Sequence, residues 1–349
     1  MDEHGVEGEV EPAFRGVRDE LAAVLREQGG GVGLCALVDG HVVCDLWGGT
    51  VGEEGLVHTW SVVKPVTAAC LLLLVDRGRV MLDTPVVELW PELAAAEDGR
   101  LVVGDVLGHR AGLVAVPAGS LAGLTSWDAT CRALEVAVPA WRPGSAHGEH
   151  ALTYGHLVGE LVRRVDGRRL GQFLAEELAG PLELDVHVGL GEPDLARAVD
   201  LDGALAPWWT ELAGSPGTLR HDALGTLTDD AVVNSQAWRC AEIPAVNGHA
   251  TARGLARFWA LQAEGRLPPD LVRPAGTGLD LVLGRDVTWT FGSAQVDPDE
   301  IGMGGVGGSY AGRRPSAGLS WAFLTTAMAD HDRAERLEAA LLTAIDTSR

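Results

Sequence analysis

The sequence predicts an α+β fold: strands from both ends of the chain form one antiparallel sheet flanked by helices, with a large, mainly helical segment inserted between them. Two β-rich runs, 32–38 and 41–47, flank Asp39-Gly40, a strong short signal for a hairpin. Strand-like runs return near the other end of the chain, at 279–283, 287–291 and 319–328. Apolar spacing between these regions is mainly helical. The antiparallel start argues against the βαβ unit of a nucleotide fold.

The other elements follow from local signals. A helix is predicted at 17–28, because apolar residues recur at helical spacing and three glycines then end it. A long buried helix is predicted to start at Ser61, and Thr251 is a plausible cap for a helix that runs to Ala263. Further helical patterns lie at 157–165, 170–178 and 332–345.

These elements divide the chain into two expected domains. Residues 1–60 and 246–349 are expected to form an α/β domain that contains the antiparallel sheet, and residues 61–245 a mainly helical domain. The helix that starts at Ser61 then lies where the two domains meet, which is a common place for a cleft. We therefore expect the active site at this junction.

Composition limits the possible partners and compartment. The chain has 349 residues, 46% of them hydrophobic, and a net charge of −22, which argues against binding to nucleic acid or an anionic membrane. The longest apolar run, 66–75, is too short to span a bilayer, and residues 1–10 are acidic and Gly-rich, unlike a secretory signal. The five cysteines are scattered without a C-x-x-C pair, which is typical of a reduced, cytoplasmic protein.

The segment Trp60-Ser61-Val62-Val63-Lys64 carries the clearest chemical signal. Positions i and i+3 share a helix face, so the Lys64 amine can reach the Ser61 oxygen. A serine becomes a good nucleophile when a neighbouring base takes its proton, and burial lowers the pKa of a lysine toward that range. By itself the pattern also fits a capping serine followed by a solvated lysine. The apolar run that follows favours a buried lysine.

Two further segments can complete such a site. Tyr154, just before a predicted helix, could shuttle a proton, since a nearby ammonium favours the phenolate. The Gly-rich segment that begins at Met303 and includes Gly304, Gly305 and Val306 could bring a backbone N–H to an oxyanion beside that of Ser61. The alternatives are a tyrosine packed at a loop–helix junction and a plain Gly-rich turn.

Together these segments resemble the serine β-lactamase-like superfamily, close to class C β-lactamases, DD-peptidases and family VIII carboxylesterases. The resemblance covers most of the chain and is carried by Trp60-Ser61-Val62-Val63-Lys64, 106–113, 150–160 and 304–309. It implies a helical domain on an α/β domain built from both termini. It also implies that Ser61 is the acylated nucleophile, Lys64 its proton partner and Tyr154 the general base and acid, with the N–H groups of Ser61 and Val306 as the oxyanion hole.

The chain departs from the family pattern at two positions. His156 stands where β-lactamases have Asn, and a neutral imidazole there can still bond Lys64. Met303, before Gly304 and Gly305, stands where they have the lysine of Lys-Thr-Gly. A thioether offers no charge to a substrate carboxylate, so we expect poor recognition of β-lactams and of D-Ala-D-Ala. We place His156, Met303, Gly304, Gly305 and Trp60 as supporting or substrate-binding residues.

No metal and no cofactor is expected. His147, His150 and His156 lie close in sequence, but no carboxylate or thiolate accompanies them at ligand spacing. The expected partners are a small acyl donor and either water or a small amine or alcohol acceptor, with no nucleic acid and no membrane. The oligomeric state stays open.

The leading functional hypothesis is a serine acyl-enzyme catalyst, an esterase, amidase or acyl transferase that acts through Ser61 on an ester, thioester or activated amide. Hydrolysis and acyl transfer use the same residues, so both stay open, and Met303 slightly favours a specialised biosynthetic transferase. One alternative is a catalytically weak binding or scaffold protein on this fold. The other is a true β-lactamase or D-amino-acid peptidase.

Overall fold

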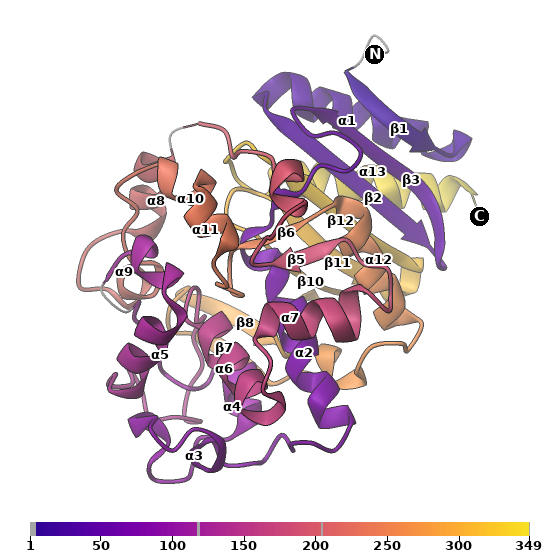
Figure 1. Cartoon of the computed structure of the whole chain (residues 1–349). Helices are drawn as coiled ribbons and strands as arrows, with labels where there is room; N and C mark the ends of the chain where they lie inside the picture. The colour runs from indigo at the N-terminus through magenta and orange to yellow at the C-terminus, as the bar shows by residue number, and fades with distance from the viewer. Residues whose placement is uncertain (1–4, 117–118, 204, 349) are drawn as a thin grey trace.

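A nine-stranded, fully antiparallel sheet forms the larger structural layer of the protein (Figure 1). The structure is a computed structural model, and it describes residues 5–116, 119–203 and 205–348. The strand order is β1-β3-β2-β12-β11-β10-β9-β8-β7. The strands are β1 Val6–Val10, β2 Gly31–Val38, β3 His41–Gly49, β7 Gly276–Asp280, β8 Arg285–Trp289, β9 Ala294–Asp297, β10 Glu300–Gly304, β11 Tyr310–Arg314 and β12 Leu319–Thr325. The expected sheet from both ends of the chain is confirmed.

The predicted hairpin at Asp39-Gly40 is confirmed. Val38 pairs with His41, and the two residues between them have φ angles of 49° and 82°. Positive φ at both central residues is the geometry of a type I′ turn, and asparagine, aspartate and glycine tolerate it best. This turn sets the register of β2 and β3 at the centre of the sheet.

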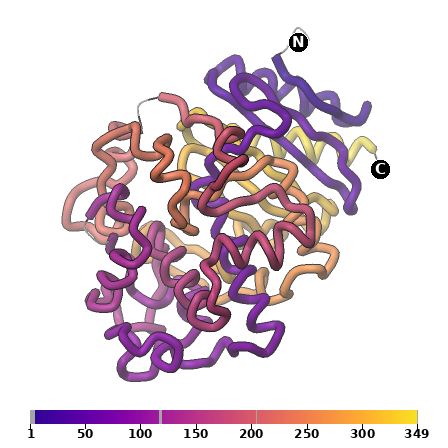
Figure 2. The backbone as a smooth tube through the Cα atoms, in the orientation of Figure 1, coloured from indigo at the N-terminus to yellow at the C-terminus, as the bar shows by residue number. Residues whose placement is uncertain are grey.

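Helices cover both faces of the sheet. The helices of the chain are α1 Arg15–Gln28, α2 Lys64–Asp76, α3 Val86–Leu89, α4 Val103–Leu107, α5 Trp127–Glu135, α6 Tyr154–Asp166, α7 Leu170–Leu174, α8 Leu205–Ala213, α9 Leu219–Leu224, α10 Ala231–Asn234, α11 Gln236–Cys240, α12 Ala252–Ala263 and α13 Asp332–Ser348. The first and last helices, α1 and α13, pack together over one face, and α12 packs on β2, β11 and β12. Figure 2 shows that β1 and the end of α13 lie at the same end of the molecule.

Side chains of the central strands alternate between two cores. In β12, Ala322 and Leu324 join the large core that continues into the helical part, whereas Trp321 and Phe323 join the smaller core under α1 and α13. This alternation is what the two-residue period of a strand requires when both sheet faces are covered. The sheet is therefore buried on both sides, and its central strands give a rigid base for the site.

The helical part lies between the two sets of strands in sequence and beside the sheet in space (Figure 1). Helix α2 crosses it and packs on α6 and α7. The first nine residues of α2, 64–72, and Leu74 are almost fully buried, including its first residue, Lys64. A helix that is apolar all round belongs inside a protein, which agrees with the predicted buried helix.

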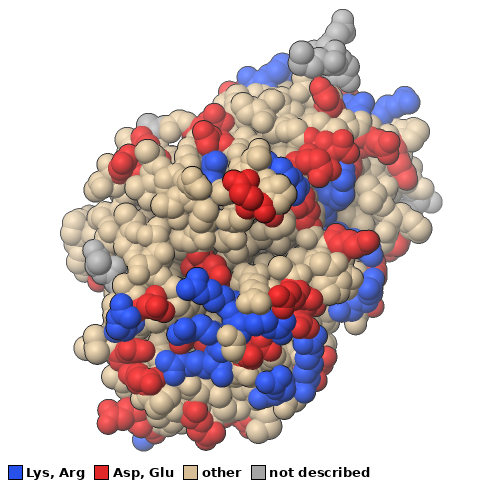
Figure 3. All heavy atoms as spheres, in the orientation of Figure 1, with Lys and Arg blue, Asp and Glu red and all other residues tan. Residues whose placement is uncertain are grey.

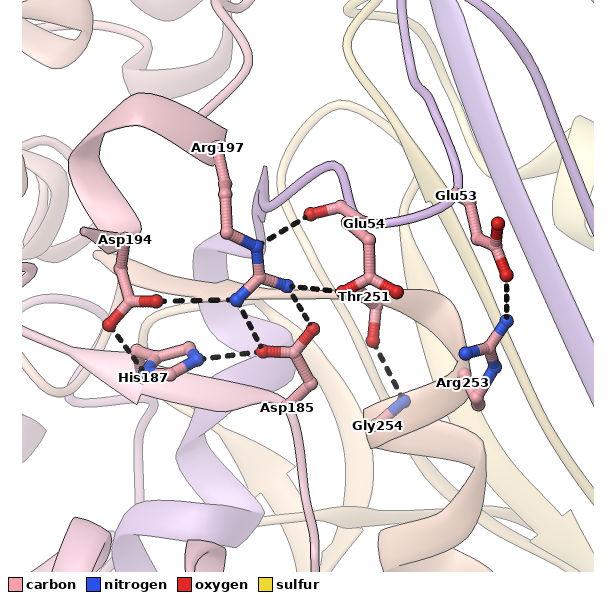
Figure 4. A network of polar contacts seen from close by, with 9 residues as sticks. All are labelled: Glu53, Glu54, Asp185, His187, Asp194, Arg197, Thr251, Arg253 and Gly254. Carbon is pink, nitrogen blue, oxygen red and sulfur yellow. Dashed lines mark hydrogen bonds and ion pairs between the residues drawn. The ribbon is translucent and has the colours of Figure 1, made fainter.

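A small sheet joins the two parts. Its strands are β4 Val57–His58, β6 Gly248–Ala250 and β5 Val186–Val188, in the order β4-β6-β5. Next to it, Arg197 forms ion pairs with Asp185 and Asp194, and its Nε donates to the Glu54 carbonyl (Figure 4). The small sheet pairs β4 and β6 of the expected α/β domain with β5 of the expected helical domain, and the division at residues 60 and 246 stays a prediction.

Acidic and basic side chains share the face drawn in Figure 3, and basic side chains gather over α6 and α7. Several of these are already paired, since Arg163 and Arg164 bind Glu160 and Arg168 binds Asp166. The concentration of basic side chains is therefore largely neutralised from within the protein. Within the described ranges, no helix is both long enough and apolar enough to cross a membrane.

Candidate active site

Ser61 lies on a short 3-10 turn, η2 Trp60–Val63, that runs directly into α2. Pro65 lies in the first turn of α2, where backbone N–H groups have no acceptor within the helix, so its missing N–H costs no helical hydrogen bond. Trp60 has a φ of 48°, which is costly for a non-glycine residue. Its ring is held against His58 at 4.6 Å and Trp209 at 5.3 Å, measured between ring centroids. This packing fixes the turn that carries Ser61.

Lys64 is fully buried and points at Ser61. Its Nζ lies 2.6 Å from Ser61 Oγ, 3.1 Å from the Ala245 carbonyl oxygen and 3.5 Å from Glu149 Oε1. Burial lowers the pKa of Lys64 to about 8, although Glu149 acts in the opposite direction. At about 1.4 kcal/mol per pH unit, this favours the neutral amine by roughly 3 kcal/mol relative to a lysine in water. The predicted contact between serine and lysine is present, and the amine can accept a proton near neutral pH.

The segment after β10 lies against the turn that carries Ser61, and glycines allow this segment to pack closely on its neighbours. A Cβ on Gly305 would lie 2.7 Å from the Thr59 carbonyl oxygen, and one on Gly304 would lie 2.6 Å from His331 Nε2. Among the described residues, the N–H groups of Ser61 and Val306 donate to no backbone carbonyl. Two unengaged N–H groups on adjoining segments are the requirement for an oxyanion hole.

Tyr154 does not face this pair, and its expected role as proton shuttle is corrected by the structure. Its hydroxyl is buried and donates to the Leu107 carbonyl oxygen at 3.2 Å. Burial raises its pKa, whereas the expected role needed a lysine nearby to lower it. Tyr154 is the first residue of α6, and its ring stacks on His109 at 4.5 Å. It is therefore a packing residue behind the site.

His156 is also turned away from Lys64. Residues two apart on a helix lie on different faces, so His156 points elsewhere than Tyr154. Its ring packs on Trp127 at 4.8 Å, near Glu160, and burial lowers its pKa to about 4. The expectation that its imidazole bonds Lys64 is wrong. The Ala245 carbonyl and Glu149 occupy the places around the amine.

Met303 lies in a small apolar cluster with Val287 and Trp289, and it is 6% exposed. Trp289 in turn contacts the His109 ring at 4.3 Å. The thioether thus brings apolar surface and no charge to this side of the site. Arg313 and Arg314, at the end of β11, are engaged with other side chains. Arg314 pairs with the carboxylates of Asp297, Glu300 and Glu338. Arg313 donates a hydrogen bond to Gln262.

Sequence reasoning missed Glu149. It lies in the loop before α6, 14% exposed, with its carboxylate facing Lys64. One signal in the sequence could have identified it. A buried lysine needs a carboxylate partner, and Glu149 is the one carboxylate between Glu135 and Glu160. Sequence alone could not show that the loop from residue 139 to 153 returns to α2.

Other features of the described residues do not form a competing centre. No group of three or more His, Cys, Asp or Glu side chains in the described ranges is arranged to hold a metal ion. A surface hollow of about 550 Å³ lies beside the small sheet, and its lining includes Arg197 and Arg253. Those two guanidinium groups already bind Asp185 and Asp45 (Figure 4 shows the first pair). Neither Ser61 nor Lys64 lines this hollow.

The family model described as Beta-lactamase matches residues 18–345. The chain belongs to the beta-lactamase family. The resemblance inferred from the motifs is thereby confirmed. Among curated proteins, the esterase/beta-lactamase LipL of Mycobacterium tuberculosis is 32% identical over 287 residues, which cover 74% of this chain and 64% of LipL. The chain therefore spans slightly less than two thirds of that relative's length.

Solved structures agree on the fold. A novel penicillin-binding protein homolog from Caulobacter crescentus is 31% identical, with a TM-score of 0.82 over 97% of this chain and 99% of that one. A family VIII carboxylesterase is 27% identical, with a TM-score of 0.86 and the same coverage of both chains. The beta-lactamase-like arrangement of sheet and helices is thus confirmed over nearly the whole chain.

Proposed function

We propose that this beta-lactamase-family chain is a serine hydrolase that cleaves small, uncharged carboxylic esters through an acyl-enzyme on Ser61. The observation that carries the proposal is the distance of 2.6 Å between Lys64 Nζ and Ser61 Oγ, at a lysine buried enough to be partly neutral. The names of LipL and of the family VIII carboxylesterase support ester substrates.

The chemistry follows from these positions. Ser61 Oγ attacks the ester carbonyl carbon while its proton passes to Lys64 Nζ, and the N–H groups of Ser61 and Val306 bind the oxyanion. The bond from the carbonyl carbon to the leaving oxygen then breaks, and that oxygen takes the proton from Lys64. Water attacks the acyl carbon in the second half, again giving its proton to Lys64, which returns it to Ser61 Oγ as the acid is released.

Uncharged substrates are favoured because, among the described residues, Lys64 is the cation that contacts Ser61, and it already serves as the proton acceptor. Met303 presents apolar surface, and the Glu149 carboxylate, 3.5 Å from the Lys64 amine, is itself negative. A substrate carboxylate placed here would lose water without gaining a partner. Transfer of the acyl group to a small amine or alcohol uses the same acyl-enzyme and is the alternative fate that we propose to test.

The test is labelling with a fluorophosphonate followed by intact mass and peptide mapping. We expect one label, on Ser61, and none in Ser61→Ala. Turnover of p-nitrophenyl acetate, with and without an added primary amine, then separates hydrolysis from transfer. A label on another serine, or full esterase activity in Ser61→Ala, would refute the proposal and leave a binding role on this fold.

A further inference from the structure

His109 holds the backbone on both sides of Glu149. The Gly148 N–H donates to the His109 carbonyl oxygen at 3.1 Å, and the His150 N–H donates to His109 Nδ1 at 3.1 Å. His109 has a φ of 59°, which is unfavourable for a residue with a side chain. Such a conformation persists where the surroundings fix it, and it often accompanies function. The loop around Glu149 is thus held in one position by a strained residue.

The His109 ring is itself fixed by aromatic packing. It stacks on Tyr154, the first residue of α6, at 4.5 Å and lies 4.3 Å from Trp289 of β8. Both partners belong to regular elements, one in the helical part and one in the large sheet. His109 therefore fixes the position of Glu149 relative to both the helical part and the large sheet, the two parts of the protein that form the site.

We propose that Glu149 is a positioning residue of this site, which holds Lys64 against Ser61 and sets the pH range in which Lys64 can accept the serine proton. The proposal rests on the function proposed above. It is carried by the 3.5 Å contact between the Glu149 carboxylate and the Lys64 amine and by the clamp that His109 places on either side of Glu149.

The other titratable groups around Lys64 are uncharged at neutral pH. Burial lowers the pKa of His109 well below its usual value and that of His150 to about 4. Burial also raises the pKa of Tyr154. Among the described residues around the amine, Glu149 thus supplies the negative charge. An opposite charge this close favours the ammonium form, so Glu149 opposes the effect of burial on the pKa of Lys64.

Removal of the carboxylate leaves burial unopposed, so Lys64 loses its proton at a lower pH. The acidic limb of a pH–rate profile reports this protonation. Glu149→Gln should therefore move the limb of the profile downward in pH, by about one pH unit, while lowering the plateau roughly tenfold because the amine is less well held. A residue that only supports the fold would lower the rate at every pH and leave the limb in place.

The experiment measures kcat/KM for p-nitrophenyl acetate and the rate of fluorophosphonate labelling of Ser61, both from pH 5.5 to 10. The variants are Glu149→Gln, Glu149→Asp and a matched control, Glu264→Gln. Glu264 pairs with Arg257 at the end of α12 and also loses one negative charge. We expect the limb to move only in Glu149→Gln, with Glu149→Asp keeping the limb of the unmodified protein. An unmoved limb in Glu149→Gln, or an equal shift in Glu264→Gln, would overturn the proposal.

A second pair of variants tests the clamp without changing a charge at Lys64. His109→Asn keeps a hydrogen-bond acceptor for the His150 N–H, and asparagine tolerates positive φ. His109→Leu keeps volume but removes the acceptor. We expect His109→Leu to shift the acidic limb as Glu149→Gln does, and His109→Asn to leave it in place. The double variant His109→Leu/Glu149→Gln should shift the limb no further than either single variant. Independent, additive shifts would contradict the clamp.

The labelling arm separates the two proposals. Absence of a Ser61 label in the unmodified protein refutes the proposed function and, with it, the role of Glu149. A Ser61 label whose pH dependence is the same in Glu149→Gln refutes the role of Glu149 alone. If Glu149→Gln fails to fold, as judged by circular dichroism, the comparison of His109→Leu with His109→Asn decides.

Discussion

Gly305, in the turn after β10, lies against Thr59, in the turn before Ser61, so closely that a Cβ would stand 2.7 Å from the Thr59 carbonyl oxygen. The first segment is near the end of the chain and the second near its beginning. Their contact brings the turn that carries Val306 against the turn that carries Ser61. The proposed oxyanion hole therefore depends on the absence of a side chain at Gly305.

Gly305→Ala is expected to push β10 away from the nucleophile turn and to lower kcat/KM for p-nitrophenyl acetate at least about tenfold. Gly16→Ala is the matched control, because a Cβ at Gly16 of α1 meets no neighbour within 4 Å. Thermal unfolding should show both variants folded. Unchanged turnover in a folded Gly305→Ala protein would rule out this placement of the oxyanion hole.

Tyr154→Phe is expected to keep most of the esterase activity. The Tyr154 hydroxyl bonds the Leu107 carbonyl, so its removal costs about 1 kcal/mol of stability and leaves Lys64 untouched. The ring remains to pack on His109. Steady-state kinetics with thermal unfolding measures both effects. A loss of a hundredfold or more in kcat with little change in melting temperature would restore Tyr154 to the proton path.

The rate of the unmodified protein should rise with pH through about 8, the pKa of Lys64. The sign follows because the neutral amine, present above that pKa, takes the Ser61 proton. Lys64→Arg should be inactive across the range, since a guanidinium stays protonated. Rates of fluorophosphonate labelling from pH 5.5 to 10 measure this. An acidic limb near pH 5 would indicate a carboxylate or imidazole base in place of Lys64.

Met303→Lys is expected to destabilise the protein without creating penicillin turnover. The new ammonium would lie in the apolar cluster with Val287 and Trp289, where it would lose its hydration. We expect the melting temperature to fall by several degrees, whereas Met303→Leu, which conserves volume, changes it little. Hydrolysis of a chromogenic cephalosporin should be poor in all three proteins. Efficient cephalosporin hydrolysis by the unmodified chain would overturn the preference for uncharged substrates.

Local patterns were sufficient for the features that depend on near neighbours in sequence. The Asp39-Gly40 turn has its own backbone preference, and Ser61 and Lys64 are one helical turn apart. The sheet from both ends followed from the two-residue period of its strands. The resemblance to family motifs predicted the family and the importance of the turn at Gly305 and Val306. Such motifs are recognised from the order of residues along the chain, so no tertiary structure was needed.

Only the tertiary structure shows which distant residues contact the Lys64 amine. Glu149 is 85 positions away, and a strained His109 holds it in place. Tyr154 and His156 occupy the expected segment, yet the rotation of α6 turns one toward Leu107 and the other toward Trp127. A sequence determines spacing along a helix, but rotation, loop path and burial come from packing against distant elements. The pKa of Lys64 depends on that burial, so it follows from the folded structure and not from the sequence alone.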